Sequence, residues 1–236
     1  MRKRSPTLIG LVLLAAHLPL LAQQTTLKVR VELELNGRRA KDVSNAVVWL
    51  TPLGVPVEHL RQVEIPRLEQ RNKNFHPALV VVPVGGQVEF PNDDPFFHNV
   101  FSLFEGKRFD LGLYEGGSTR FVQFDRPGIS YIFCNIHAQM SAVVVALSTP
   151  YFGISGANGE VSIMNVPAGR YRMQVFHASA LPDDLQALSR EVTVTDRDSS
   201  LGVLRIKESS AAGTHKNKYG RDYDPPSPDS PVYARP

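Results

Sequence analysis

Four side chains that can bind a soft metal ion lie in two segments of the chain. Cys134, the only cysteine, is followed by His137 and Met140 at intervals of three residues, and His98 lies upstream. Together they offer one thiolate, two imidazoles and one thioether. This donor set suits a single copper ion in a trigonal site with a weak axial sulfur, as in blue-copper electron carriers. The sequence therefore predicts one copper site formed by His98, Cys134, His137 and Met140.

The chain must bend around these residues for their side chains to meet. Residues 130–133 and 142–147 have strand patterns, so the three donors between them are expected in a turn. A turn can direct them toward one point, whereas an extended strand sends alternate residues to opposite faces. His98 begins another predicted strand after the Pro-rich turn at 91–95. Asn99 beside it is expected to join the two ligand segments by hydrogen bonds.

Each donor also has an ordinary structural interpretation when it is considered alone. A single Cys is usually a small buried apolar residue, and a single Met usually fills a gap in the core. The combination at this spacing favours a metal site instead. Zinc accepts Cys and His, but a Met ligand argues against it. A binuclear copper site and a c-type haem would each need a second cysteine.

The N-terminal segment has the character of an export signal. Residues 2–4 are basic, residues 8–14 are apolar, and cleavage is expected after Ala22. We therefore expect residues 1–22 to be a signal peptide and the mature protein to be periplasmic, without a membrane span. An uncleaved anchor is the alternative. In an oxidising compartment a lone cysteine cannot form a disulfide within the chain, and metal binding gives it a role.

The charge balance argues against one class of partner. The chain has 26 Lys and Arg residues and 23 Asp and Glu residues, and segment 1–22 contains three of the basic residues and no acidic one. The mature chain is therefore close to neutral. Because no strong basic excess remains, a nucleic-acid partner is not expected.

Strand patterns dominate the rest of the chain. Residues 27–36 alternate apolar and polar side chains, and the Asn36-Gly37 pair favours a turn. Further strands are predicted over 46–50, 78–84, 87–90, 98–103, 119–124, 160–164, 171–176, 190–194 and 202–206, with one short helical turn in 181–189. We therefore predict an all-β fold built from sandwiches. The polar, Pro-rich segment 208–236 is expected to be a disordered tail.

The metal motif resembles that of the cupredoxins. The resemblance lies in Cys134-Asn135-Ile136-His137 and Met140, together with His98-Asn99-Val100 upstream. The short ligand loop is similar to that of amicyanins, and about 70–148 resembles periplasmic cupredoxin-like proteins labelled methylamine-utilisation or plastocyanin-like. The resemblance implies a Greek-key sandwich over 63–148 with a type 1 copper site. That group commonly has an Asp-Trp pair where this chain has Ala138-Gln139.

The flanking segments resemble a different small sandwich. Residues 27–62 and 149–207 are similar to the opening and later strands of carboxypeptidase-regulatory-like, transthyretin-type domains. We therefore predict that the cupredoxin domain at 63–148 is inserted into that sandwich. The alternative is two sandwiches in series, in which 27–50 supplies the first cupredoxin strands. The pairing partners of strand 27–35 distinguish the two.

The sequence favours an electron carrier rather than an enzyme. No Ser has the partners of a nucleophilic triad, and Asp93-Asp94, flanked by prolines, is interpreted as a solvated turn. Redox proteins of the cytochrome or dehydrogenase type, bound transiently, are the expected partners. One alternative is copper buffering, delivery or sensing without electron relay. Another is an envelope interaction module in which the metal site is secondary.

Overall fold

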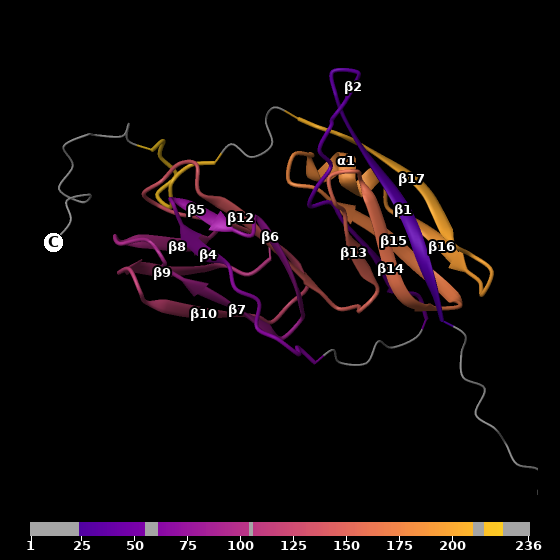
Figure 1. Cartoon of the computed structure of the whole chain (residues 1–236), viewed down its shortest axis with the longest axis horizontal. Helices are drawn as coiled ribbons and strands as arrows, with labels where there is room; N and C mark the ends of the chain where they lie inside the picture. The colour runs from indigo at the N-terminus through magenta and orange to yellow at the C-terminus, as the bar shows by residue number, and fades with distance from the viewer. Residues whose placement is uncertain (1–23, 55–60, 104–105, 210–214, 224–236) are drawn as a thin grey trace, which may run out of the picture.

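The described residues form two β-sandwiches that lie side by side (Figure 1). The computed structural model describes residues 24–54, 61–103, 106–209 and 215–223, so the predicted signal peptide at 1–22 lies outside it. Strands and one short helix make up the regular structure, and the all-β prediction is confirmed. Within these ranges, no helix is both long enough and apolar enough to cross a bilayer.

The central sandwich is built from the middle of the chain. Its strands are β4 (Glu69–Arg71), β5 (Asn74–His76), β6 (Leu79–Pro83), β7 (Gly86–Pro91), β8 (His98–Ser102), β9 (Phe109–Tyr114), β10 (Thr119–Phe124), β11 (Gly128–Phe133) and β12 (Ser141–Leu147). The larger sheet has the order β6-β12-β11-β8-β9, and β7 pairs with β10 in a second sheet. Apolar side chains from both sheets pack into one core, which contains Phe90, Phe124, Ile132 and Val144.

The flanking sandwich combines strands from both ends of the described chain. They are β1 (Gln24–Leu35), β2 (Arg38–Arg39), β3 (Val47–Pro52), β13 (Phe152–Ile154), β14 (Glu160–Pro167), β15 (Gly169–Phe176), β16 (Arg190–Val194) and β17 (Ser200–Lys207), with helix α1 (Pro182–Ala187) between β15 and β16. One sheet has the order β14-β1-β17, and the other has the order β13-β3-β15-β16.

The pairing of β1 shows how the two sandwiches share the chain. β1 is antiparallel to β14 and parallel to β17, and it forms no ladder with β4 to β12. The central sandwich therefore lies, in sequence, between β3 and β13 of the flanking sandwich. This is the pairing that the insertion hypothesis requires. The exact boundaries of the five predicted segments and the likeness of the flanking sandwich to transthyretin-type domains stay predictions.

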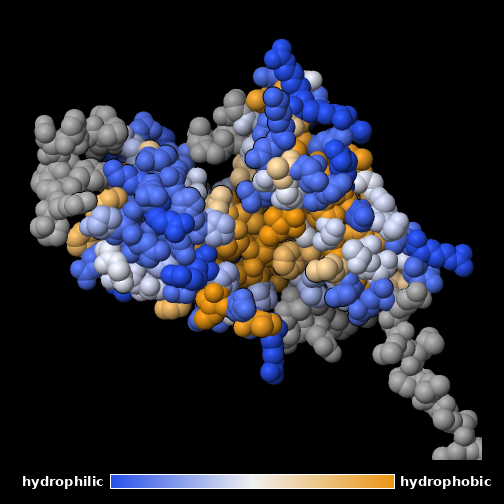
Figure 2. Space-filling view, viewed as in Figure 1, coloured by the Kyte–Doolittle hydropathy of each residue, from blue (hydrophilic) through white to orange (hydrophobic). Residues whose placement is uncertain are grey.

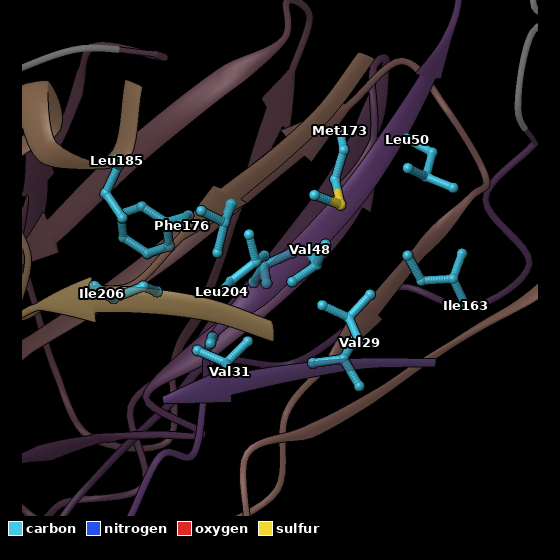
Figure 3. Close-up of a cluster of buried hydrophobic side chains, with 14 of the residues drawn as sticks. Val29, Val31, Val48, Leu50, Ile163, Met173, Phe176, Leu185, Leu204 and Ile206 are labelled. Atoms are coloured by element: carbon cyan, nitrogen blue, oxygen red, sulfur yellow. The ribbon is translucent and has the colours of Figure 1, made fainter. Parts of the chain in front are cut away.

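The alternating pattern of β1 explains its central place. Leu27, Val29, Val31 and Leu33 are at most 2 % exposed, and they point between the two sheets of the flanking sandwich. Figure 3 shows Val29 and Val31 near side chains of β3, β15 and β17. Full burial of each such side chain contributes about 1.5–3 kcal/mol. β1 then turns at Asn36 and Gly37, whose φ angles of 50° and 75° fit the predicted turn.

Strand β12, which lies between β6 and β11 in the larger sheet, is buried on both faces. Val80 and Val144 pack into the central core, whereas Val143, Val145 and Leu147 belong to the core of the flanking sandwich. This explains the nearly continuous apolar run in β12. Figure 2 shows hydrophobic surface gathered where the two sandwiches meet. The two sandwiches are therefore joined by apolar packing as well as by the chain.

Candidate metal centre

The predicted ligands lie at the ends of three strands of the central sandwich. His98 is the first residue of β8, Cys134 directly follows β11, and Met140 directly precedes β12. The backbone N–H of Cys134 donates to the Met140 carbonyl at 3.3 Å, and the N–H of Met140 donates to the His137 carbonyl at 3.1 Å. Because β11 and β12 are antiparallel neighbours, these bonds close the predicted ligand loop as a tight turn.

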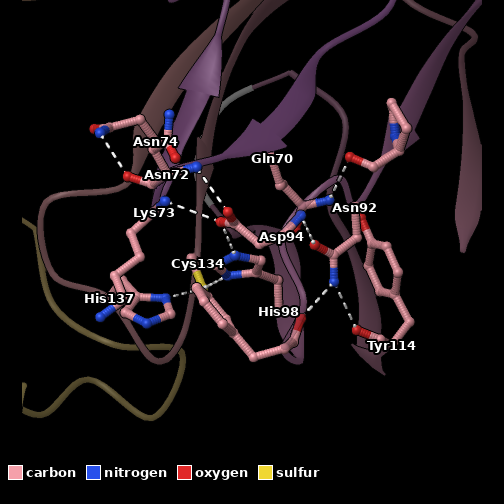
Figure 4. Close-up of polar contacts among 12 residues, drawn as sticks. Gln70, Asn72, Lys73, Asn74, Asn92, Asp94, His98, Tyr114, Cys134 and His137 are labelled. Carbon is pink, nitrogen blue, oxygen red and sulfur yellow. Dashed lines mark hydrogen bonds and ion pairs between the residues drawn. The ribbon is translucent and has the colours of Figure 1, made fainter. Parts of the chain in front are cut away.

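Three of the four predicted donors form one cluster (Figure 4). Cys134 Sγ lies 3.7 Å from His98 Nδ1 and 3.6 Å from His137 Nδ1. The three donor atoms lie within 4.8 Å of one another. An ion bonded at about 2.3 Å to sulfur and about 2.0 Å to nitrogen holds those atoms about 3.5–3.7 Å apart at tetrahedral to trigonal angles. The cluster therefore has the dimensions of a mononuclear metal site.

Met140 is fully buried in the same apolar cluster as Cys134. Its backbone closes the ligand loop, as described above. This placement is compatible with the predicted axial thioether, and the Met140 ligand itself stays a prediction.

Asp94 is a part of the site that the sequence interpretation missed. Its Oδ2 lies 2.8 Å from His98 Nε2, the ring nitrogen that faces away from Cys134. The backbone N–H groups of Asn72 and Lys73 donate to the two carboxylate oxygens at 2.7 and 2.9 Å. Asp94 is buried, so the solvated-turn interpretation is wrong for it, although Asp93 is exposed.

The bond between Asp94 and His98 fixes the orientation of the imidazole. Burial alone would raise the pKa of Asp94, but the N–H of Lys73 and the imidazole of His98 outweigh it and hold the pKa below its usual value. The ionised carboxylate accepts a hydrogen bond from Nε2–H, which keeps the ring proton on Nε2 and leaves the Nδ1 lone pair free to bind a metal. The sequence offered one sign of this role, because Asp94 lies four residues before the predicted ligand His98.

The side chain of Asn99 bonds to β9 and not, as we expected, to the ligand loop. Its side chain donates to the Asp110 carboxylate at 2.7 Å and to the Gly112 carbonyl at 2.9 Å, both in β9. The link from Asn99 to the ligand loop is its backbone N–H, which bonds to Cys134. The expected connection between ligand segments therefore exists through the backbone, while the side chain holds β8 to β9.

All three clustered donors are uncharged near neutral pH. Burial lowers the pKa of His137 to about 4, and the neighbouring His98 adds to this effect. Burial also lowers the pKa of His98, against the opposing effect of Asp94. Burial raises the pKa of the Cys134 thiol, although backbone N–H groups of Asn99, Ile136 and His137 oppose the shift. The imidazoles are therefore ready to bind a cation, while the thiol must first lose its proton.

No protein-family model and no curated protein sequence matches this chain. Solved structures are similar to part of it. A purple cupredoxin from Nitrosopumilus maritimus is 21 % identical with a TM-score of 0.32, over 35 % of this chain and 99 % of that one. Amicyanin from Paracoccus versutus is 18 % identical with a TM-score of 0.31, over 37 % of this chain and 85 % of that one.

A copper-containing nitrite reductase from Thermus scotoductus is 22 % identical with a TM-score of 0.35, over 42 % of this chain. The matched part covers 26 % of that enzyme. At these identities and scores, the function proposed below rests on the geometry of the site itself.

Proposed function

We propose that this protein binds one copper ion through His98, Cys134 and His137, with Met140 as a weak axial ligand, and carries single electrons between redox proteins in the periplasm. The observation that supports this most is the preformed cluster of one thiol and two imidazole Nδ1 atoms at 3.6 and 3.7 Å. One sulfur and two nitrogens with an axial thioether form the donor set of electron-transfer copper.

The residues around the donors suit a site that changes little between two oxidation states. A bound copper ion supplies one-electron chemistry. His98 and Cys134 are fully buried and His137 is 5 % exposed, so water is largely excluded from the donors. Asp94 fixes the His98 ring and three backbone N–H groups fix the Cys134 sulfur. A site held in this way favours electron transfer over copper delivery, which requires ligand exchange.

The docking surface of this proposal lies beside β8. Phe97, next to His98, is 50 % exposed, and Leu113, which pairs with Asn99 across β8 and β9, is 63 % exposed. Exposed apolar side chains at this end of the sandwich suit weak, transient contact with a cytochrome or dehydrogenase.

The deciding experiment is the addition of Cu(II) to the purified apo-protein. The proposal predicts one bound copper and an intense blue colour from the thiolate-to-copper transition. Cys134→Ser should abolish the colour, and Ser141→Ala, at an exposed position beside the loop, should keep it. A colourless complex, or preferential retention of zinc over copper, would contradict electron transfer and favour metal buffering.

Met140→Leu tests the axial ligand separately. The substitution keeps the apolar volume and removes the thioether, so the blue colour should persist while the reduction potential shifts. The potential is measured by titration of the colour against redox mediators. An unchanged potential would show that Met140 is core packing only.

A further inference from the structure

The C-terminal segment His215–Tyr223 contacts the ligand loop, although its sequence favoured disorder. The Tyr223 hydroxyl donates to the Cys134 carbonyl at 2.8 Å, and the Lys218 backbone N–H donates to Asn135 Oδ1 at 2.9 Å. The prediction of a disordered tail over 208–236 is therefore wrong for this segment. Residues 224–236 lie outside the described residues.

Aromatic packing supports these hydrogen bonds. The His215 ring stacks on Phe133, the residue before Cys134, with ring centroids 4.0 Å apart. Tyr223 meets His215 edge-on, and its hydroxyl lies 3.2 Å from His215 Nδ1. The two ends of the segment thus form a unit over the start of the ligand loop.

A third contact reaches the other ligand segment. Lys218 Nζ lies 2.8 Å from Asp110 Oδ2, while Asp110 Oδ1 accepts the side-chain bond from Asn99. Asn99 follows His98 and bonds through its backbone to Cys134. Burial alone would raise the pKa of Asp110, but the bonds from Lys218 and Asn99 outweigh it and keep the carboxyl ionised. Lys218 therefore contacts both segments that supply ligands, directly or through one residue.

We propose that residues 215–223 form a clasp that holds the ligand loop closed in its metal-binding conformation, with Tyr223 and Lys218 as the positioning residues. The clasp follows β17 of the flanking sandwich in sequence and lies on the central sandwich (Figure 1). The flanking sandwich thus contributes to the metal site through its C-terminal extension. The role of the clasp in metal binding rests on the proposed function, but the main test of the clasp uses the protein without metal.

The test uses Cys134 as a probe in the apo-protein. Because Cys134 is the only cysteine and is fully buried, iodoacetamide can modify it only when the ligand loop opens. Loss of one clasp hydrogen bond should raise the modification rate about two- to tenfold, which is the effect expected for a bond of this kind. Tyr223→Phe and Lys218→Met are the test variants.

Two matched variants separate the clasp from general stability. Tyr171→Phe removes a hydroxyl that donates to the Pro167 carbonyl at 2.8 Å, in the flanking sandwich. Lys216→Met removes an exposed lysine from the same segment. In both variants, Cys134 should be modified at the wild-type rate. Lys218→Arg keeps the cation beside Asp110 and should retain most of the protection of Cys134. Equal rates in the test variants and the controls would overturn the clasp.

The copper-loaded protein provides a second readout. Tyr223→Phe and Lys218→Met should each shift the blue absorption band. They should also speed the loss of copper to a chelator by about the same two- to tenfold factor as the modification of Cys134. Suppose that the wild-type protein turns blue, but Cys134 modification and copper loss in the test variants are as slow as in the controls. The clasp proposal then fails, and the electron-carrier proposal stands. If the wild type remains colourless while the apo-protein rates respond as expected, the electron-carrier proposal fails and the clasp stands.

Discussion

At the residue scale, the three clustered donors His98, Cys134 and His137 are neutral side chains that are buried away from solvent. Burial disfavours the imidazolium and thiolate forms alike, which lowers the pKa of His98 and His137 and raises that of Cys134. The three N–H groups near the sulfur reduce the cost of the thiolate. A bound metal cation would supply the remaining stabilisation, so metal binding would be linked to loss of the thiol proton.

This linkage predicts the pH dependence of metal binding. Between the lowered imidazole pKa values, that of His137 being about 4, and the raised thiol pKa, the free site carries one displaceable proton. The affinity for Zn²⁺, a stand-in without redox chemistry, should therefore rise about tenfold per pH unit from about pH 7 to 8. Calorimetry in buffers of different ionisation enthalpy measures the released protons. Release of two or three would mean that the imidazoles are charged in the free protein.

Asp94 is the residue outside the ligand set with the clearest predicted effect. Asp94→Asn removes the anionic acceptor of His98 Nε2 and should lower copper affinity about 10- to 100-fold, as loss of such a partner does in other metal sites. Asp93→Asn is the matched control, since it neutralises the exposed neighbour. Competition with a chelator measures both. Equal affinities for the two variants would show that Asp94 does not support the site.

At the element scale, the turn between β9 and β10 supports Asp94. The Gly117 N–H donates to the Asn92 carbonyl at 2.7 Å, and the Asn92 N–H donates to the Ser118 carbonyl at 2.9 Å. A Cβ atom on Gly116 would lie 2.2 Å from the Asp94 carbonyl oxygen. The turn and the Asp94 loop therefore fit together only with glycine at position 116.

Gly116→Ala should displace backbone on both sides of this contact. We expect a loss of about 1–3 kcal/mol in the free energy of unfolding, the usual cost of overpacking, together with weaker copper binding because Asp94 moves. Gly156→Ala is the control, since its nearest neighbour would be at 3.7 Å. Urea unfolding and chelator competition measure the two effects. Wild-type copper affinity in a destabilised Gly116→Ala protein would separate the turn from the site.

At the scale of the whole molecule, the two sandwiches share an apolar boundary. Val143, Val145 and Leu147 of β12 pack into the core of the flanking sandwich, and Tyr131 of β11 meets Phe176 of β15 with ring centroids 6.1 Å apart. Unfolding of either sandwich would expose this boundary to water. We therefore expect the two to unfold together.

The chain contains one natural reporter for each sandwich. Trp49, the only tryptophan, lies in β3, and Cys134, the only cysteine, lies in the central sandwich. In a urea titration of the apo-protein, Trp49 fluorescence and Cys134 reactivity should change with the same midpoint. A Trp49 transition that leaves Cys134 protected would mean that the flanking sandwich unfolds independently.

The sequence by itself determined the features that depend on local spacing. The alternation in β1 defined its buried face, and the Asn36-Gly37 turn followed from local backbone preferences. Cys134 and His137 are three residues apart in a turn, so their proximity was predictable, and His98 followed from its position at a strand start. The helical turn predicted in 181–189 is α1.

Only the tertiary structure decided which distant segments meet. Asp94 is buried because the backbone of Asn72 and Lys73 covers its carboxylate, and no local pattern encodes that contact. The 215–223 segment has a polar composition, and its order depends on contacts with Cys134 and Asn135 more than 80 residues away. For β1, the resemblance of the flanking segments suggested partners from the far end of the chain, but the register with β14 and β17 came only from the structure. Such contacts depend on the free energy of packing the whole chain, which a local pattern cannot specify.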